Sequence, residues 1–348
     1  MFNNLLGRFS RDMGIDLGTA NTLVYVRDKG IVINEPSIVA INTRADQILA
    51  VGENARKMLG KTPPHIITSR PLSDGVISDF EIAERMLKHF IAKVHQDKFS
   101  FYTRPRVIIG IPLEITEVER KAVEDAAMQA GAREVFLVEE PMAAAIGARL
   151  PIQESCGNMI VDIGGGTTEI AVISLAGIVT WKSLPIAGNE LTEDIIEYAR
   201  EKYNLLIGET TAEEIKIKIG SVFPLEKSLK TIMRGRDLVS GLPKEETITD
   251  EEVREAMQRS AKILAVNIRD TIESTPPELV ADIYSRGIVL SGGGALLKGL
   301  QDLIYREVQV PIHITDDPLT AVVRGLGIII EDMNTLKDVL LPSAGEIT

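Results

Sequence analysis

The chain has 348 residues, of which 45% are hydrophobic, so it is long and apolar enough to bury two cores, and we expect a globular protein of two domains. A net charge of −12 and an aromatic content of 4% disfavour a nucleic-acid partner. The single cysteine, Cys156, excludes an intramolecular disulfide, and with neither a signal peptide nor an apolar run of about 18 residues we expect a cytoplasmic protein without a spanning helix.

The first ten residues predict a short amphipathic helix. Its apolar side consists of Phe2, Leu5, Leu6 and Phe9, which follow helical spacing, and Arg8 lies on the other side. An apolar face beside basic residues is typical of a helix that lies in the plane of an anionic lipid surface. Burial of this stripe in the protein core is the alternative that the pattern leaves open.

The chain contains a short internal sequence repeat. Residues 13–32 and 159–179 share an apolar strand, an Asp-x-Gly, a Thr six residues after the Asp, a second strand and a turn glycine. The glycines after Asp16 and Asp162 let the backbone turn tightly, with its N–H groups directed into the bend. A hairpin of this kind can cradle a phosphate, and its repetition predicts two related halves.

An α/β alternation lies between the two copies. It comprises a strand at Val107–Ile111, a helix opened by the capping box Thr116-x-x-Glu119, a strand at Val135–Val138 and an Ala-rich helix from Pro141. The pattern favours doubly wound sheets. Before it, Phe99 to Tyr102 form a second apolar stretch. Burial in the core is one interpretation, and a membrane loop is the one that the family resemblance given below implies.

The second half continues with helices and one more glycine-rich turn. Capping boxes at Thr211-x-x-Glu214 and Thr249-x-x-Glu252 predict two helix starts, and Pro276-Pro277 ends the longer helix. The polar stretch around residues 234–246 is predicted to be a loop or hairpin. The turn Ser291–Gly294, after a strand at Ile288–Leu290, offers a bare backbone surface against which an adenine and ribose could pack.

These motifs together resemble the actin, sugar-kinase and DnaK-type chaperone superfamily, and within it the MreB family of bacterial actins, including paralogues such as Mbl. The resemblance covers nearly the whole chain in order. The matching strings are DLGTANT (16–22), NEPS (34–37), DGVISDF (74–80), EEPMAAAIG (139–147), DIGGGTTE (162–169), LIGETTAE (206–213), TPPEL (275–279) and SGGGALLKG (291–299).

The resemblance implies an α/β, actin-like duplicated ribonuclease-H-like fold, with two domains flanking a nucleotide cleft. Domain I would take residues 1–145 with 318–348, and its small subdomain about 33–75. Domain II would take residues 146–317, and its small subdomain about 185–245. The implied function is a filament-forming cytoskeletal ATPase that assembles on the inner membrane face and organises cell-wall synthesis to maintain rod shape, with ATP and Mg²⁺ as cofactors.

The resemblance also implies the residues that contact the nucleotide. They are Gly18, Thr19, Ala20 and Asn21 in the first phosphate loop, Gly164, Gly165, Gly166, Thr167 and Thr168 in the second, and Glu213 and Lys216 on the adenosine side with Gly293, Gly294, Ala295 and Leu296 opposite. An ordinary exposed pair on a helix is the alternative for Glu213 and Lys216.

Asp16 and Asp162 would face the Mg²⁺, through its waters, because this ion dehydrates reluctantly. Glu140 would orient the attacking water with Thr167 beside it, since phosphoryl transfer depends mostly on positioning and charge neutralisation. A Glu that simply caps the next helix is the alternative for Glu140. The family often has Gly-Gly-Asp where this chain has Ala187-Gly188-Asn189, and an acidic residue where it has Thr192, so contacts of those carboxylates near the ribose are in doubt.

The implied partners are further copies of the chain, anionic inner-membrane lipid and membrane-bound cell-wall elongation proteins. Two other functions of the superfamily compete with the filament. A sugar kinase would need an aspartate base beside a substrate pocket, and a chaperone would need a substrate-binding domain after residue 348. High-speed sedimentation with ATP and no small substrate separates the filament from both.

Overall fold

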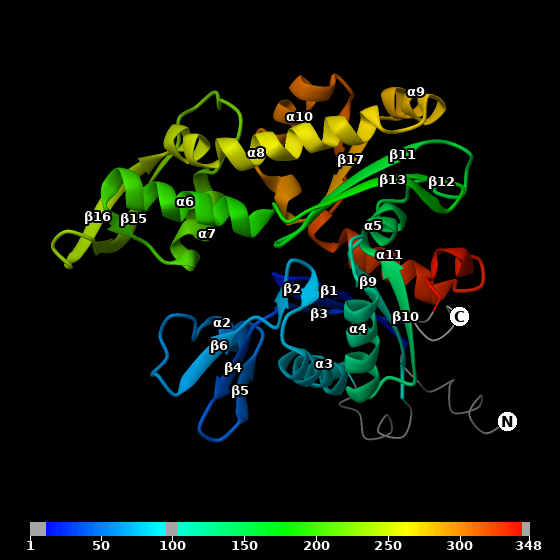
Figure 1. The fold of residues 1–348 in the computed structure, drawn as a ribbon, viewed down its shortest axis with the longest axis horizontal. Helices are drawn as coiled ribbons and strands as arrows, with labels where there is room; N and C mark the ends of the chain where they lie inside the picture. The colour runs from blue at the N-terminus through cyan, green and yellow to red at the C-terminus, as the bar shows by residue number, and fades with distance from the viewer. Residues whose placement is uncertain (1–11, 95–103, 343–348) are drawn as a thin grey trace. The chain divides into compact units, whose positions relative to one another are not determined.

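The computed structural model describes residues 12–94 and 104–342, which divide into two compact units. Unit 1 takes the described parts of residues 1–155, 173–178 and 319–348, and unit 2 takes residues 156–172 and 179–318. Figure 1 shows that both units combine sheets with helices. The α/β class expected from the strand and helix signals is therefore confirmed.

Unit 1 is built on a five-stranded sheet of order β10-β9-β1-β2-β3. Its strands are β1 (Met13–Leu17), β2 (Asn21–Val26), β3 (Gly30–Pro36), β9 (Arg106–Ile111) and β10 (Glu134–Glu139). β9 runs parallel to β1 and β10, whereas β2 is antiparallel to β1 and β3. Burial on both faces explains why β1 and β9 are almost continuously apolar.

Helices and a smaller sheet complete unit 1. They are α3 (Phe80–Val94), α4 (Glu117–Gln129), α5 (Glu140–Gly147), α11 (Ala321–Glu331), the short helices α2 (Glu53–Arg56), η4 (Pro318–Thr320) and η5 (Lys337–Val339), and strands β4 (Val39–Asn42), β5 (Gln47–Val51), β6 (Ile66–Ser69), β7 (Leu72–Ser73) and β8 (Val76–Ile77). The predicted capping box at Thr116 and Glu119 is present at the start of α4. The Thr116 side chain accepts from the backbone N–H of Glu119, and the Glu119 side chain accepts from the backbone N–H of Thr116. Two N–H groups that lack a partner within the helix are thereby satisfied.

The main sheet of unit 2 has the strand order β13-β12-β11-β17-β18. This order matches that of unit 1 when the unit 1 sheet is followed from β3 to β10. The sheets of unit 2 contain β11 (Asn158–Ile163), β12 (Thr168–Ser174), β13 (Gly177–Leu184), β17 (Ile288–Ser291), β18 (Ile312–Ile314), and, in a separate three-stranded sheet, β14 (Leu205–Leu206), β15 (Lys230–Asp237) and β16 (Pro243–Thr249). β11 is parallel to β17, as β1 is to β9. The internal echo in the sequence is therefore a duplicated structural unit.

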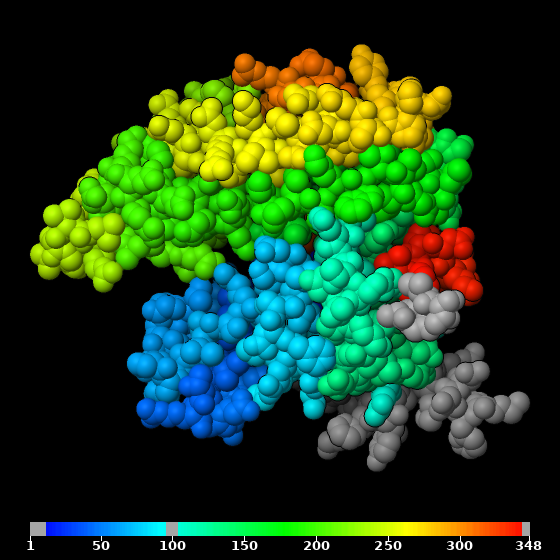
Figure 2. Space-filling model, viewed as in Figure 1, coloured from blue at the N-terminus to red at the C-terminus, as the bar shows by residue number. Residues whose placement is uncertain are grey.

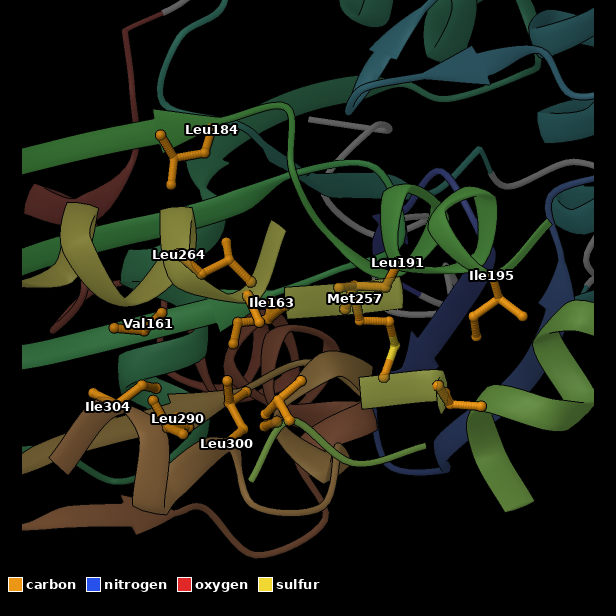
Figure 3. Close-up of a cluster of buried hydrophobic side chains, with 14 of the residues drawn as sticks. Val161, Ile163, Leu184, Leu191, Ile195, Met257, Leu264, Leu290, Leu300 and Ile304 are labelled. Atoms are coloured by element: carbon orange, nitrogen blue, oxygen red, sulfur yellow. The ribbon is translucent and has the colours of Figure 1, made fainter. Parts of the chain in front are cut away.

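The helices of unit 2 cover this sheet. They are α6 (Gly188–Tyr203), α7 (Glu209–Ile219), α8 (Asp250–Glu273), α9 (Pro277–Arg286), η3 (Gly293–Leu296) and α10 (Leu300–Val308). Figure 3 shows the core between sheet and helices, with Val161 and Leu290 from adjacent strands near Leu264 of α8. One side of α8 is buried while the other lies on the surface, visible in yellow in Figure 2.

Three boundary predictions had different outcomes. The capping box at Thr249 and Glu252 is confirmed, and the stretch around residues 234–246 is the β15–β16 hairpin. The helix start at Thr211 is wrong, because α7 begins at Glu209 and the N–H of Thr211 already donates to the carbonyl of Gly208. A Thr-x-x-Glu spacing inside a polar helix satisfies the capping pattern without marking an end.

Candidate functional site

The first phosphate loop is the turn between β1 and β2. Asp16 pairs with Leu23 and Leu17 with Thr22, so residues 18–21 connect the paired positions of the two strands. A side chain on Gly18 would meet the carbonyl oxygen of Asn21 at 2.8 Å, so the tight turn excludes a Cβ at Gly18. The expected loop residues thus lie at one tight bend that follows a buried strand.

Two residues outside this loop hold it. Ser37 donates its backbone N–H to the carbonyl of Ala20 at 3.0 Å and its hydroxyl to the carbonyl of Gly18 at 2.6 Å. The N–H of Gly75 donates to the Thr19 hydroxyl at 2.9 Å. Both belong to strings that support the family resemblance, but the sequence assigned no role to either. Hydrogen bonds between segments this far apart have no local signal.

The second phosphate loop is the turn between β11 and β12. Gly164 donates its N–H to the carbonyl of Thr167 at 2.9 Å and accepts from the N–H of Gly188 at 3.1 Å. The carbonyl of Gly165 accepts from the N–H of Asn189 at 2.8 Å. The first turn of α6 therefore holds this loop, and Asn189 contributes through its backbone where the family often has an acidic side chain.

Asp162 lies at the end of β11, and only 6% of its surface is exposed. Ser291, its register partner on β17, donates its hydroxyl to Oδ1 of Asp162 at 2.6 Å. Burial raises the pKa of Asp162 from 3.8 to about 6, although the Ser291 hydrogen bond acts to lower it. A carboxylate that is costly to ionise in this way would be stabilised by a nearby cation.

Asp16 and Glu140 occupy neighbouring strand ends of unit 1. Asp16 pairs with Gly110 of β9, and Gly110 pairs with Val138 of β10, which leads directly into α5. Glu140 is the first residue of α5 and is buried, with only 8% of its surface exposed. A Cβ on Gly110 would lie 3.4 Å from Cγ of Glu140. Gly110 and the Glu140 side chain are therefore neighbours, which the sequence did not indicate.

Burial of Glu140 weighs against a role as a simple helix cap. The N-cap of α5 is Glu139, whose side chain makes no capping hydrogen bond, and burial raises the pKa of Glu139. Glu140 as the residue that orients the attacking water remains our prediction.

Glu213 and Lys216 form an ion pair one turn apart on α7, with 2.6 Å between Nζ and Oε2. The Lys216 ammonium also donates to the carbonyl of Gly188 at 2.6 Å and to the Thr192 hydroxyl at 2.8 Å. Thr192 lies 2.6 Å from Oε2 of Glu213. Thr192 therefore joins both charged side chains, and Lys216 supports the same Gly188 that holds the second phosphate loop.

The third turn packs directly on the second loop's strand. Gly292 has a φ of 78°, and a Cβ on it would lie 2.3 Å from the carbonyl oxygen of Ile163. A Cβ on Gly294 would lie 2.2 Å from the Ile163 side chain. Only glycine fits at either position. Of the other predicted contacts, Ala295 is buried, while Gly293 and Leu296 are exposed.

Each unit offers one carboxylate that is compatible with a Mg²⁺ held mainly by phosphate and water. Within the described part of the chain, no group of three or more His, Cys, Asp or Glu side chains could hold a metal by itself. Asp162 supplies one desolvated carboxylate in unit 2, and Asp16 one carboxylate in unit 1. Mg²⁺ commonly binds through one or two carboxylates, substrate phosphates and waters, so either carboxylate by itself is compatible with it.

The membrane residues predicted from the sequence lie outside the described residues. These are Phe2, Leu5, Leu6 and Phe9, and the stretch Phe99 to Tyr102. Among the helices of residues 12–94 and 104–342, none has the length and apolar character to cross a membrane.

A family model described as MreB/Mbl protein matches residues 10–338. This chain belongs to the MreB/Mbl family. Curated members that it resembles include the cell shape-determining protein Mbl of Bacillus cereus, 51% identical over 94% of this chain and 98% of that protein. The cell shape-determining protein MreB of Escherichia coli K12 is 50% identical over 94% of this chain and 95% of that protein.

Solved structures give the same family and fold. MreB5 of Spiroplasma citri bound to ADP is 38% identical, has a TM-score of 0.89, and aligns with 95% of this chain and 98% of that one. MreB5 bound to AMPPNP also has a TM-score of 0.89, with 94% and 97% covered. The MamK double helical filament, at 23% identity and a TM-score of 0.78, shows the fold alone. The actin-like fold expected of an MreB/Mbl member is therefore confirmed.

Proposed function

We propose that this chain is a filament-forming bacterial actin that binds ATP with Mg²⁺ and hydrolyses it slowly. The observation that carries the proposal is the pair of phosphate-type loops after Asp16 and Asp162, each at the same place in a repeated sheet. MreB5 of Spiroplasma citri, which is 38% identical to this chain, has been solved bound to ADP and to AMPPNP. The curated relatives are cell shape-determining proteins, which supports a role in rod shape.

In this proposal, each phosphate loop contributes backbone N–H groups to the nucleotide. Gly18 to Asn21 form the loop of unit 1 and Gly164 to Thr168 the loop of unit 2, and N–H groups in a tight glycine turn form a concave anion site. Glu213 faces the ribose side, and the Gly293 to Leu296 turn offers the apolar surface for the base. Bound Mg²⁺ supplies charge neutralisation on the phosphates.

Glu140 acts on water. Its carboxyl at the start of α5 accepts a hydrogen bond from the attacking water and orients it for in-line displacement, with Thr167 as its helper. In this mechanism the protein mainly has to position the water, and a buried Glu140 side chain is suited to that task. Hydrolysis would then set the lifetime of subunits in the filament.

We further propose that the filament assembles on the inner face of the membrane and contacts cell-wall elongation proteins there. The support is the amphipathic spacing of Phe2, Leu5, Leu6 and Phe9 in the sequence, and the names of the curated relatives. Linking many weak anchors along a polymer raises effective affinity without any new contact.

The experiment is high-speed sedimentation and electron microscopy of the purified full chain with ATP, ADP or no nucleotide, with and without anionic vesicles. Filaments that need nucleotide, and that collect on vesicles, support the proposal. A chain that binds ATP but never sediments would refute the filament. Turnover of ATP only when a sugar is added would favour the sugar kinase instead.

A further inference from the structure

We propose that Ser37 is the positioning residue of the first phosphate loop, because it turns the loop's N–H groups toward the nucleotide. The inference rests on the proposed nucleotide binding and adds a residue that contacts no phosphate itself. Ser37 follows the end of β3 and is fully buried. Two of its hydrogen bonds reach two different carbonyls of the loop, those of Gly18 and Ala20.

The direction of these bonds can be assigned from the groups themselves. The carbonyl of Gly18 can only accept, so the Ser37 hydroxyl proton lies on the 2.6 Å bond to it. Thr22 Oγ1 lies 2.9 Å from Ser37 Oγ, and its own proton must therefore point to Ser37. The result is a buried chain of bonds from Thr22 through Ser37 to Gly18, which fixes the Ser37 rotamer.

Peptide geometry then links these carbonyls to the N–H groups. In a trans peptide, the C=O of one residue and the N–H of the next point in opposite directions. Since Ser37 holds the carbonyls of Gly18 and Ala20, the N–H groups of Thr19 and Asn21 point away from Ser37. Two N–H groups of one loop are thus turned to the same side, as an anion site requires.

The second phosphate loop is also held by hydrogen bonds to two of its carbonyls, but the donors are different atoms. The N–H groups of Gly188 and Asn189 hold the carbonyls of Gly164 and Gly165. Gly164 corresponds to Gly18, since each lies two residues after its aspartate. In the second loop a backbone N–H holds this carbonyl, whereas in the first loop the Ser37 hydroxyl does so. Mutation can remove the Ser37 hydroxyl but cannot remove a backbone N–H. The effect of holding the loop carbonyls can therefore be tested at Ser37.

Ser37 does not act alone on the loop. The N–H of Gly75 binds the Thr19 hydroxyl at 2.9 Å and fixes the middle of the bend from another segment. Gly75 has a φ of 78° and follows Asp74 at 50°, so it belongs to a tight turn. The loop is therefore held at Gly18, Thr19 and Ala20 together. Loss of the Ser37 hydroxyl releases the Gly18 end, while the backbone N–H of residue 37 still holds the Ala20 carbonyl.

The test compares ADP with adenosine, in the presence of Mg²⁺, on the purified full chain and two variants. Ser37→Ala removes the hydroxyl, and Ser37→Cys keeps a weaker donor of similar size. We expect Ser37→Ala to weaken ADP binding by about tenfold, which corresponds to the loss of one well-placed hydrogen bond, and to leave adenosine binding within about twofold. Ser37→Cys should fall between wild type and Ser37→Ala.

The matched control is Thr275→Val, which removes a buried hydroxyl that donates to the carbonyl of Thr271 at 2.7 Å, at the end of α8. It should lower the melting temperature as Ser37→Ala does, with ADP binding unchanged. Equal losses of ADP and adenosine in Ser37→Ala would show a merely structural role and overturn the inference, as would unchanged ADP binding in both Ser37 variants. If the wild-type chain itself binds neither ligand, the proposed function fails instead.

Discussion

The hydroxyl of Ser291 donates to Oδ1 of Asp162 across the register of two parallel strands, at 2.6 Å inside unit 2. Burial makes the carboxylate expensive to ionise and raises the pKa of Asp162 to about 6, although the hydrogen bond from the neutral Ser291 hydroxyl acts to lower it. The raised pKa suits Asp162 to a nearby cation. It also makes the folding stability of the nucleotide-free protein dependent on pH.

The sign follows from the direction of the shift. Because the folded pKa lies above the value of 3.8 for an unperturbed Asp, the folded state holds this proton longer than the unfolded chain. The stability from Asp162 is fully present below about pH 4 and is lost as pH rises toward about 6, by about 2–3 kcal/mol. We expect Asp162→Asn to raise the melting temperature of the nucleotide-free protein at pH 7.5, with little difference at pH 4.5.

The same variant should weaken Mg²⁺-ADP binding, because it removes the charge that we propose faces the metal. Calorimetric melting at both pH values and ADP titration with and without Mg²⁺ provide the measurements. A variant that is less stable than wild type at pH 7.5 would contradict the assigned pKa direction. Equal Mg²⁺ dependence in the two proteins would contradict the metal role.

Glu140→Gln is expected to lower phosphate release from ATP by about 10²-fold or more and to leave ATP affinity nearly unchanged, because it removes only the orientation of water. The amide preserves the size of the side chain, which packs against Gly110. The measurement is phosphate release in single turnover, beside ATP titration. Hydrolysis at the wild-type rate would exclude Glu140 from this role.

Lys216→Met should weaken ADP binding about tenfold, because the ammonium no longer holds the carbonyl of Gly188 beside the second phosphate loop. Lys218→Met is the matched control, since that exposed lysine of the same helix donates to Thr231 at 3.1 Å. Titration of both variants separates loss of the network from loss of positive charge. Equal affinities in the two variants would show that the Lys216 contacts do not reach the site.

Gly147→Ala should destabilise unit 1 by roughly 2 kcal/mol or more, because its Cβ would lie 1.9 Å from the carbonyl oxygen of Ala321 at the contact of α5 with α11. Gly208→Ala is the control, since nothing lies within 4 Å of a Cβ there. Urea unfolding of both variants gives the comparison. A loss below about 0.5 kcal/mol at Gly147 would mean that the two helices separate without cost.

Phe2→Glu combined with Phe9→Glu should abolish co-sedimentation with anionic vesicles while ATP-dependent filaments still form in solution. Burial of each large side chain is worth about 1.5–3 kcal/mol, but ordering about ten residues removes much of that gain. Single subunits should therefore bind vesicles marginally and filaments firmly. If the double variant stays on vesicles, the stretch Phe99 to Tyr102 becomes the anchor to test.

The sequence by itself determined the features that depend on local order. Apolar runs predicted the strands at residues 107–111 and 288–290, and two of three capping boxes marked true helix starts. The echo around Asp16 and Asp162 predicted two equivalent halves, because a tight glycine turn after a buried strand is encoded within a few residues. The family could be predicted for the same reason, since its motifs are contiguous.

Only the tertiary structure decided which distant groups hold these motifs in place. Ser37 and Gly75 on the first loop, Gly110 beside Glu140, and Thr192 between Glu213 and Lys216 all act through contacts between separate segments. The Thr211 box failed because α7 already begins at Glu209, so Thr211 lies inside the helix and not at its start. Hydrogen bonds and burial depend on what the fold brings together, and a linear pattern does not contain that information.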